Sequence, residues 1–131
     1  MTSDSLAASA DASALKGKTG LRRVLQAGAY SWAGLLAAFK GEAAFRQLLL
    51  LNGLLIPLAC YLAVGRVERA VLIAVCLLAL IVELLNSAIE AAIDRISLEL
   101  HPLSKQAKDL GSAAQMVALT LIAVVWAVIL L

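Results

Sequence analysis

Residues 70–94, AVLIAVCLLALIVELLNSAIEAAID, combine an apolar run with a row of polar side chains. The run from Ala70 to Leu85 is apolar apart from Glu83. Five polar residues follow one helical spacing, namely Glu83, Asn86, Ser87, Glu90 and Asp94. Because an α-helix turns about 100° per residue, these five share one face of one helix. The segment therefore predicts a membrane-spanning helix over about 68–96, with a polar stripe along one side.

The composition of the whole chain also indicates a membrane protein. Of its 131 residues, 63% are hydrophobic and 15% are charged, against about 45–50% and about 25% in ordinary soluble domains. A chain this short has too much surface to hide so many apolar side chains in one soluble core. The net charge is only +2, and no basic run interleaves with aromatic residues. We therefore expect no nucleic-acid partner.

Two more apolar runs predict two more spanning helices. The first helix is expected over about 43–64, where Pro57 bends it without ending it. The other is expected over about 107–131, because the chain carries no charge from Ala113 onward. The predicted fold is thus an all-α integral membrane protein with three transmembrane helices, within a membrane-embedded domain over 21–131.

The connections between these helices are charged or polar. Residues 65–69 are expected to form a tight charged turn. Residues 95–112 form the second connection, in which Pro102 ends any helix near His101. Cys60 and Cys76 lie inside apolar runs, so we interpret them as small hydrophobic residues and not as metal ligands or a disulfide.

The N-terminal part has two predicted segments. Residues 1–20 are rich in Ala, Ser and Asp, lack an apolar signal sequence, and are expected to form a disordered cytosolic tail. Over 21–40, apolar residues recur at helical spacing and basic residues lie off that stripe. This pattern predicts an amphipathic helix on the membrane surface. Docking of this helix on another protein is the alternative.

The distribution of Lys and Arg predicts the orientation. Residues 1–47 hold six of them, residues 65–69 hold two, and residues 86–112 hold three. The positive-inside rule therefore places the N-terminus and the second connection in the cytoplasm. We therefore expect a multi-pass membrane protein with its N-terminus in the cytoplasm.

The polar stripe predicts a carboxylate site at the cytosolic interface. An ionisable group such as Glu83 costs several kcal/mol inside a bilayer unless it faces protein or water, and a buried carboxylate is suited to act as a general base on a lipid hydroxyl. Glu90 and Glu42 are expected at one depth nearer the cytosol, where two carboxylates and phosphate oxygens suit Mg²⁺. The basic residues suited to phosphate are Arg23, Lys105 and Lys108. Asn86 and Ser87 also suit hydrogen bonds between helices.

Four blocks of the sequence resemble the bacterial integral-membrane diacylglycerol kinase family, which includes undecaprenol kinases. They are YSW (30–32), EAAFRQ (42–47), VELLNSAIE (82–90) and AKDLGSAA (107–114). The resemblance runs from about residue 20 to residue 131. It implies a homotrimer with active sites shared between subunits, and transfer of the γ-phosphoryl group of ATP to a lipid alcohol.

The resemblance also implies roles for individual residues. Glu83 matches the catalytic base, and Glu42 and Glu90 match the ligands of Mg²⁺. The other matches to catalytic positions are Asn86, Lys108 and Asp109. ATP contacts are implied for Arg23, Tyr30, Glu42, Glu90, Glu99, His101, Lys108 and Asp109. Lipid contacts are implied for Ala27, Ser31, Trp32, Ala44, Phe45, Arg46, Gln47, Arg69, Glu83, Ser112 and Trp126.

Three functional alternatives follow. The blocks at 30–32 and 42–47 favour diacylglycerol over undecaprenol as the lipid alcohol, with phosphatidic acid as the product. A second functional class, a small proton-coupled transporter with Glu83 as the proton carrier, is the next alternative. It leaves Glu42, Lys108 and Asp109 without a role. A catalytically silent membrane subunit would not need the row of carboxylates.

Overall fold

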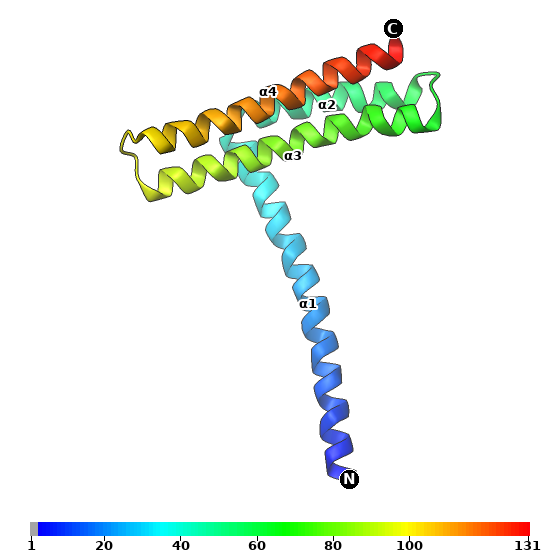
Figure 1. Ribbon diagram of the computed structural model, residues 1–131. Helices are drawn as coiled ribbons and strands as arrows, with labels where there is room; N and C mark the ends of the chain where they lie inside the picture. The colour runs from blue at the N-terminus through cyan, green and yellow to red at the C-terminus, as the bar shows by residue number, and fades with distance from the viewer. Residues whose placement is uncertain (1–2) are drawn as a thin grey trace. The chain divides into compact units, whose positions relative to one another are not determined.

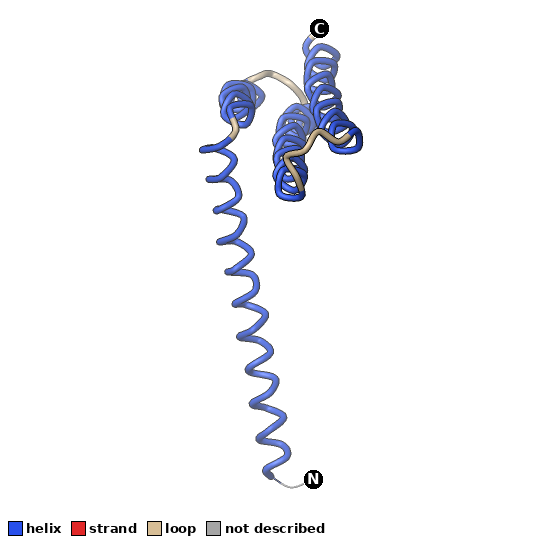
Figure 2. Tube along the Cα trace, turned by 90° about the vertical axis from the view of Figure 1, so that its left-hand side faces the viewer, coloured by secondary structure: helices blue, strands red, loops and turns tan. Residues whose placement is uncertain are grey.

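The computed structural model describes residues 3–131, with side chains from residue 19 onward. It contains four helices, α1 (Ser3–Gly41), α2 (Ala43–Tyr61), α3 (Arg66–Ile96) and α4 (Pro102–Leu130) (Figure 1). Figure 2 shows helices and loops and no strand in this described part. The predicted all-α fold is confirmed. The chain divides into two units, one ending at Ala37 and one spanning Ala38–Leu131.

Three helices are long and apolar enough to cross a membrane. They are α2 with 19 residues, α3 with 31 and α4 with 29. At about 1.5 Å per residue, a hydrocarbon core of about 30 Å needs roughly 20 residues. α3 and α4 exceed that length. The second unit therefore contains three helices able to span a membrane, as predicted.

α1 begins earlier than the sequence analysis predicted. It runs as one helix from Ser3, whereas residues 1–20 were expected to be a disordered tail. Five alanines at 7, 8, 10, 12 and 14 explain the difference, because alanine has the highest helix propensity and no proline interrupts the segment. The apolar side chains of the predicted stripe are exposed within this unit, among them Leu21, Leu25 and Trp32.

The first connection between spanning helices lies earlier in the chain than predicted. α2 ends at Tyr61 and α3 begins at Arg66, so the four charged-turn residues after Gly65 are already helical. Two side chains explain this. The backbone N–H of Gly65 donates to Glu68 Oε2 at 3.3 Å, and Arg69 donates to the carbonyl oxygens of Ala59 at 3.0 Å and Leu62 at 2.9 Å. Arg69 therefore caps the C-terminus of α2.

The last helix starts at Pro102 instead of near residue 107. Proline suits the first helical position because its missing N–H would have no partner there. His101 precedes it, and its Nδ1 accepts a hydrogen bond from the backbone N–H of Leu103 at 3.1 Å. Pro102 was expected to stop a helix. Instead it begins α4, and α3 has already ended at Ile96.

α3 is the central helix of the second unit, since both α2 and α4 pack against it (Figure 1). Leu72, Cys76 and Ala79 of α3 are fully buried. The core continues with Leu48 and Ala59 of α2 and with Ala118, Ile122 and Trp126 of α4. Alanines at these contacts let helix backbones approach closely, which favours helix association inside lipid. The prediction that Cys76 is a small buried hydrophobe is confirmed.

A buried amide links α2 to α3 within this core. Asn52 is 3% exposed, and its Nδ2 donates to the carbonyl oxygen of Cys76 at 2.9 Å. A hydrogen bond of this kind between membrane helices contributes on the order of 0.6 kcal/mol. Asn52 therefore fixes the register of α2 on α3.

Gly111 of α4 allows α4 to approach α3 closely beside Asn86. A Cβ added at Gly111 would overlap Asn86 Oδ1 of α3. Gly111 is buried, so the space that its missing side chain leaves is filled by the Asn86 amide. The two polar segments of α3 and α4 are thereby held together.

Gly111→Ala is expected to destabilise the protein, because the added methyl must push Asn86 or α4 aside. Overpacking of this kind costs about 1–3 kcal/mol. The control is Gly53→Ala in α2, where an added Cβ meets nothing within 4 Å. That change should be neutral or stabilising by up to about 1 kcal/mol. Denaturation followed by circular dichroism in detergent measures both, and equal stability of the two variants would contradict the packing.

Candidate functional site

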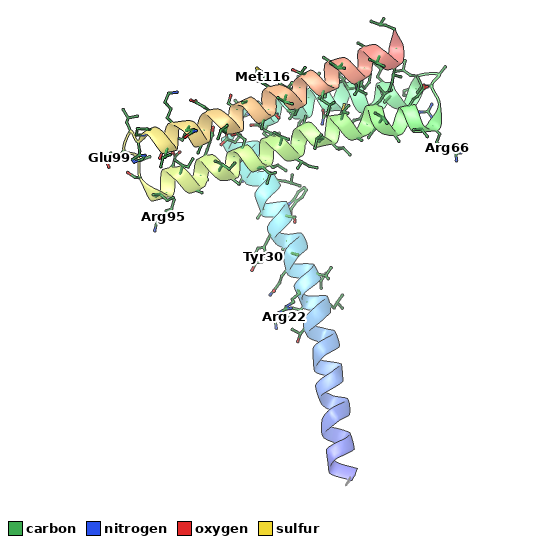
Figure 3. All side chains as sticks on the ribbon, in the orientation of Figure 1. Arg22, Tyr30, Arg66, Arg95, Glu99 and Met116 are labelled. Carbon is green, nitrogen blue, oxygen red and sulfur yellow. The ribbon has the colours of Figure 1, made fainter. Side chains whose placement is uncertain are left out.

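A polar cavity of about 370 Å³ lies between α3, α4 and the start of α2. Its lining residues are Glu42, Ala44, Glu83, Asn86, Glu90, Ser112, Gln115, Met116 and Leu119. Met116, labelled in Figure 3, marks its level along α4. Six of these were predicted from the sequence as catalytic, metal or lipid residues: Glu42, Ala44, Glu83, Asn86, Glu90 and Ser112. The structure brings these six together.

One helix, α3, and one residue between helices, Glu42, supply the three carboxylates. Glu83 and Glu90 are seven residues apart on α3 and so lie on one face. Glu42 has extended backbone angles (φ −119°, ψ 109°) between α1 and α2. Glu83 is 4% exposed, and both other carboxylates lie close enough to act on its charge. The cavity therefore concentrates negative charge around one buried carboxylate.

Amide and hydroxyl groups complete the cavity. Gln115 of α4 lines the cavity together with Glu83. Within the described part of the chain, three buried oxygen atoms near this level have no hydrogen-bond partner, namely Asn86 Oδ1, Ser87 Oγ and Gln115 Oε1. Unpaired buried acceptors of this kind are uncommon in proteins and call for a partner such as water, an ion or a ligand.

Sequence reasoning missed Gln115. The signal was present, because Lys108, Ser112 and Gln115 are spaced i, i+4 and i+7 and share one face of α4. Gln115 interrupts the third apolar run in the same way that Glu83 interrupts the second. A polar residue within a spanning helix faces protein or water for the same reason.

A second cavity of about 670 Å³ lies at the connection of α3 and α4. It contains four of the predicted nucleotide-binding residues, Glu99, His101, Lys108 and Asp109. Lys108 Nζ lies 2.8 Å from Asp94 Oδ1, and Lys105 Nζ lies 2.6 Å from Asp109 Oδ2. Each of the two lysines at the cavity wall is therefore paired with a carboxylate.

The two cavities follow one another along the same helices. Glu90 lines the first and Asp94 lines the second, one turn further along α3. Ser112 and Lys108 stand in the same relation on α4. Four residues advance an α-helix by about 6 Å. A continuous polar strip thus leads from buried Glu83 to the exposed loop between α3 and α4.

The donor atoms suit a Mg²⁺ ion that is shared with a substrate. Among the described residues, no three His, Cys, Asp or Glu side chains form a metal site by themselves. The first cavity does offer the carboxylates of Glu42 and Glu90 and the unpaired Asn86 Oδ1. Mg²⁺ in phosphate-transferring proteins is held by one or two carboxylates together with phosphate oxygens and water. The residues present fit that mode of binding.

Several predicted lipid contacts do not lie at the first cavity. Arg69 is fourteen residues from Glu83, about 21 Å along α3, and Figure 3 shows its neighbour Arg66 at the opposite end of the bundle from Glu99. Trp126 is 8% exposed and packs in the core, and Phe45 is 2% exposed. Arg46 donates to the carbonyl oxygens of Phe39 at 2.7 Å and Lys40 at 3.2 Å. Gln47 is exposed.

Five other predicted residues belong to the unit that ends at Ala37. They are Arg23, Ala27, Tyr30, Ser31 and Trp32. All five are exposed within that unit, and Ser31 Oγ donates to the Ala27 carbonyl oxygen of its own helix at 2.9 Å. Their contacts with ATP and lipid stay predictions.

Comparison with known proteins identifies the family. The model of the family described as prokaryotic diacylglycerol kinase matches residues 29–130. A diacylglycerol kinase of Pseudomonas aeruginosa is 72% identical over 119 residues, covering 91% of this chain and 97% of that protein. A diacylglycerol kinase of Escherichia coli K12 is 47% identical over 112 residues, covering 86% and 92%. The matched region contains both cavities, and the chain belongs to the prokaryotic diacylglycerol kinase family.

Proposed function

We propose that this protein is an ATP-dependent lipid kinase that transfers the γ-phosphoryl group of ATP to the hydroxyl of diacylglycerol. The product is phosphatidic acid. The observation that carries the proposal is the placement of buried Glu83 in one cavity with Glu42, Glu90 and Asn86. Family membership supports the same activity, because the named relatives are diacylglycerol kinases.

Glu83 is the proposed general base. Its carboxylate is buried at the inner end of the polar strip, so a lipid alcohol reaches it from the membrane while water is largely kept out. It accepts the proton of the lipid hydroxyl as that oxygen attacks the γ-phosphorus of ATP. A bond forms between the lipid oxygen and phosphorus, and the bond from phosphorus to the β,γ-bridging oxygen breaks, releasing ADP. Such transfers depend mainly on positioning and charge stabilisation.

Glu42 and Glu90 are the proposed ligands of Mg²⁺. When bound, the ion neutralises charge on the β- and γ-phosphates and on the departing ADP. Asn86 is proposed to order this part of the site through its unpaired Oδ1. Without a bound cation, both carboxylates would repel the phosphates of ATP.

Lys108 and Asp109 are proposed to hold the phosphate chain and orient the catalytic residues. Lys108 lies one turn beyond Ser112 on α4 and is paired with Asp94 at 2.8 Å. That ion pair is half exposed, so it contributes little to stability, and the ammonium remains able to contact an anion. Glu99 and His101 line the same cavity and are proposed to contact the nucleoside, together with Arg23 and Tyr30 of α1.

The membrane arrangement is proposed from charge and from the position of the cavities. The N-terminus and the α3–α4 connection lie on the cytoplasmic side of the inner membrane, where most Lys and Arg are found. ATP then enters at the second cavity. The lipid reaches the first cavity from the bilayer.

A homotrimer with shared active sites is the proposed assembly, as the family resemblance implies. The described chain leaves many large apolar side chains exposed on its spanning helices, including Leu54 (65%), Val117 (65%) and Val128 (76%). Lipid tails or another copy of the chain can cover such surfaces inside a bilayer. Residues that lie far from Glu83 within one chain, such as Arg69 and Trp126, would then serve a lipid bound by a neighbouring subunit.

The first test is transfer of labelled γ-phosphate from ATP to lipid by the purified protein in mixed micelles. Diacylglycerol and undecaprenol are supplied side by side, with and without Mg²⁺. We expect Mg²⁺-dependent label in phosphatidic acid. Preference for undecaprenol would change the substrate and keep the chemistry. Absence of label on both lipids, from folded protein, would contradict the kinase and favour a proton-coupled transporter.

Glu83→Gln is expected to reduce kcat by about 10²–10⁴-fold, because it keeps the side-chain volume and removes the base. The same labelled-phosphate assay measures the loss. Glu68→Gln is the matched control, since this carboxylate lies at the opposite end of α3 and should leave kcat unchanged. Full activity of a folded Glu83→Gln protein would exclude the base assignment.

Glu90→Gln is expected to raise the Mg²⁺ concentration needed for half-maximal activity by about tenfold or more, because a neutral amide binds a hard cation far less well. Titration of activity with Mg²⁺ at fixed ATP gives the value, and Glu68→Gln again serves as the control. An unchanged Mg²⁺ titration would show that Glu90 is no ligand.

A further inference from the structure

We propose that Gln115 is a positioning residue that holds the Glu83 carboxylate in the orientation needed to accept a proton from the lipid hydroxyl. This inference rests on the proposed kinase function. It concerns a residue of α4 that lies outside every block by which the sequence resembles the family, and that faces the proposed base across the α3–α4 contact.

The shared cavity supports this role. Gln115 lines the same cavity as Glu83, and Gly111 and Asn86, which lie about one turn away on the same two helices, approach each other closely. An ionised carboxylate only accepts hydrogen bonds, so the NH₂ group is the part of the amide that can serve Glu83. Gln115 Oε1 is buried with no partner among the described residues, so no contact of that oxygen with them fixes the amide.

The surroundings of Glu83 explain why it needs such a partner. Glu42 and Glu90 both lie near enough to repel its charge, and neither donates a hydrogen bond when ionised. A carboxylate with several accessible rotamers, pushed by two like charges, would spend little time aimed at the substrate. One donated hydrogen bond selects one orientation and leaves the second carboxylate oxygen for the lipid hydroxyl. Misplacement of a reacting group by about 1 Å can cost on the order of 10²-fold in rate.

The position of α4 makes the contact precise. Gly111 lies one turn before Gln115 and lets α4 approach Asn86 closely. Asn86 is itself three residues after Glu83 on α3, so the two contacts between these helices lie one turn apart. The rigid approach at Gly111 therefore fixes the distance over which the Gln115 side chain must reach Glu83.

The competing explanation is that Gln115 only ties α3 to α4. Interhelical hydrogen bonds from Gln do stabilise membrane proteins. A purely structural link would lower stability when removed and would affect catalysis only through unfolding. A positioning residue instead lowers kcat in protein that is fully folded, and it leaves the binding of ATP and lipid unchanged.

The test compares Gln115→Met with Thr120→Val in the labelled-phosphate assay with diacylglycerol. Methionine keeps the length of glutamine and removes its donor. Thr120 is an exposed residue of α4 whose hydroxyl donates only within its own helix, to the Met116 carbonyl oxygen at 2.8 Å. For Gln115→Met we expect kcat to fall about 10- to 100-fold, as for loss of a hydrogen bond to a charged group. KM for ATP and for diacylglycerol should stay within about twofold, and Thr120→Val should match the unmodified protein.

Two further measurements keep the inference falsifiable. Thermal midpoints in detergent show whether each variant is folded, and rates are expressed per folded protein. Gln115→Asn, which keeps the amide but is one methylene shorter, should give a kcat between those of Gln115→Met and the unmodified protein. An unchanged kcat in folded Gln115→Met overturns the role, as does a raised KM without loss of kcat. Absence of activity in the unmodified protein would instead refute the proposed kinase function.

Discussion

The cost of burying the Glu83 carboxylate is the constraint on which the rest of the site depends. A carboxylate inside a spanning helix is tolerated only where it faces protein or water. α3 meets this need by turning its polar face toward α4 and the start of α2, where Glu83 is 4% exposed. The apolar faces of α3 are then left for the core with α2 and for lipid. One residue thereby sets the rotation of the central helix, and the helix sets the positions of Asn86 and Glu90.

A second constraint is the close approach of α4 to α3. Gly111 lacks the side chain that would otherwise meet Asn86, and one turn further on Gln115 lines the first cavity together with Glu83. Away from the site, Asn52 ties α2 to α3 by its bond to the Cys76 carbonyl oxygen. Hydrogen bonds of this kind are individually weak in membranes. Here the hydrogen bond adds to close packing that already restricts sliding of the helices along one another.

The helices and the main site were predictable because both rest on periodicity. The apolar runs gave three spanning helices, and the spacing of Glu83, Asn86 and Glu90 placed them on one face. Helix ends were less predictable. Pro102 starts α4 as well as ending the preceding loop, and Glu68 and Arg69 act as caps where a turn was expected. Gln115 was missed because a single uncharged polar residue in an apolar run gives a weak signal until a facing carboxylate is known.

The spacing along α3 has a chemical consequence. Seven residues separate Glu83 from Glu90, which is about 10 Å along the helix axis, and Asp94 lies a further 6 Å or so beyond. A hydroxyl that reaches Glu83 and a phosphate chain that extends from Glu90 toward Lys108 would therefore approach each other from opposite directions along one groove. In-line displacement requires the attacking and leaving oxygens to lie on opposite sides of the γ-phosphorus. With the roles proposed for Glu83 and Glu90, a single membrane helix would present a bilayer-borne hydroxyl and a water-borne phosphate chain from opposite sides, as that requirement demands.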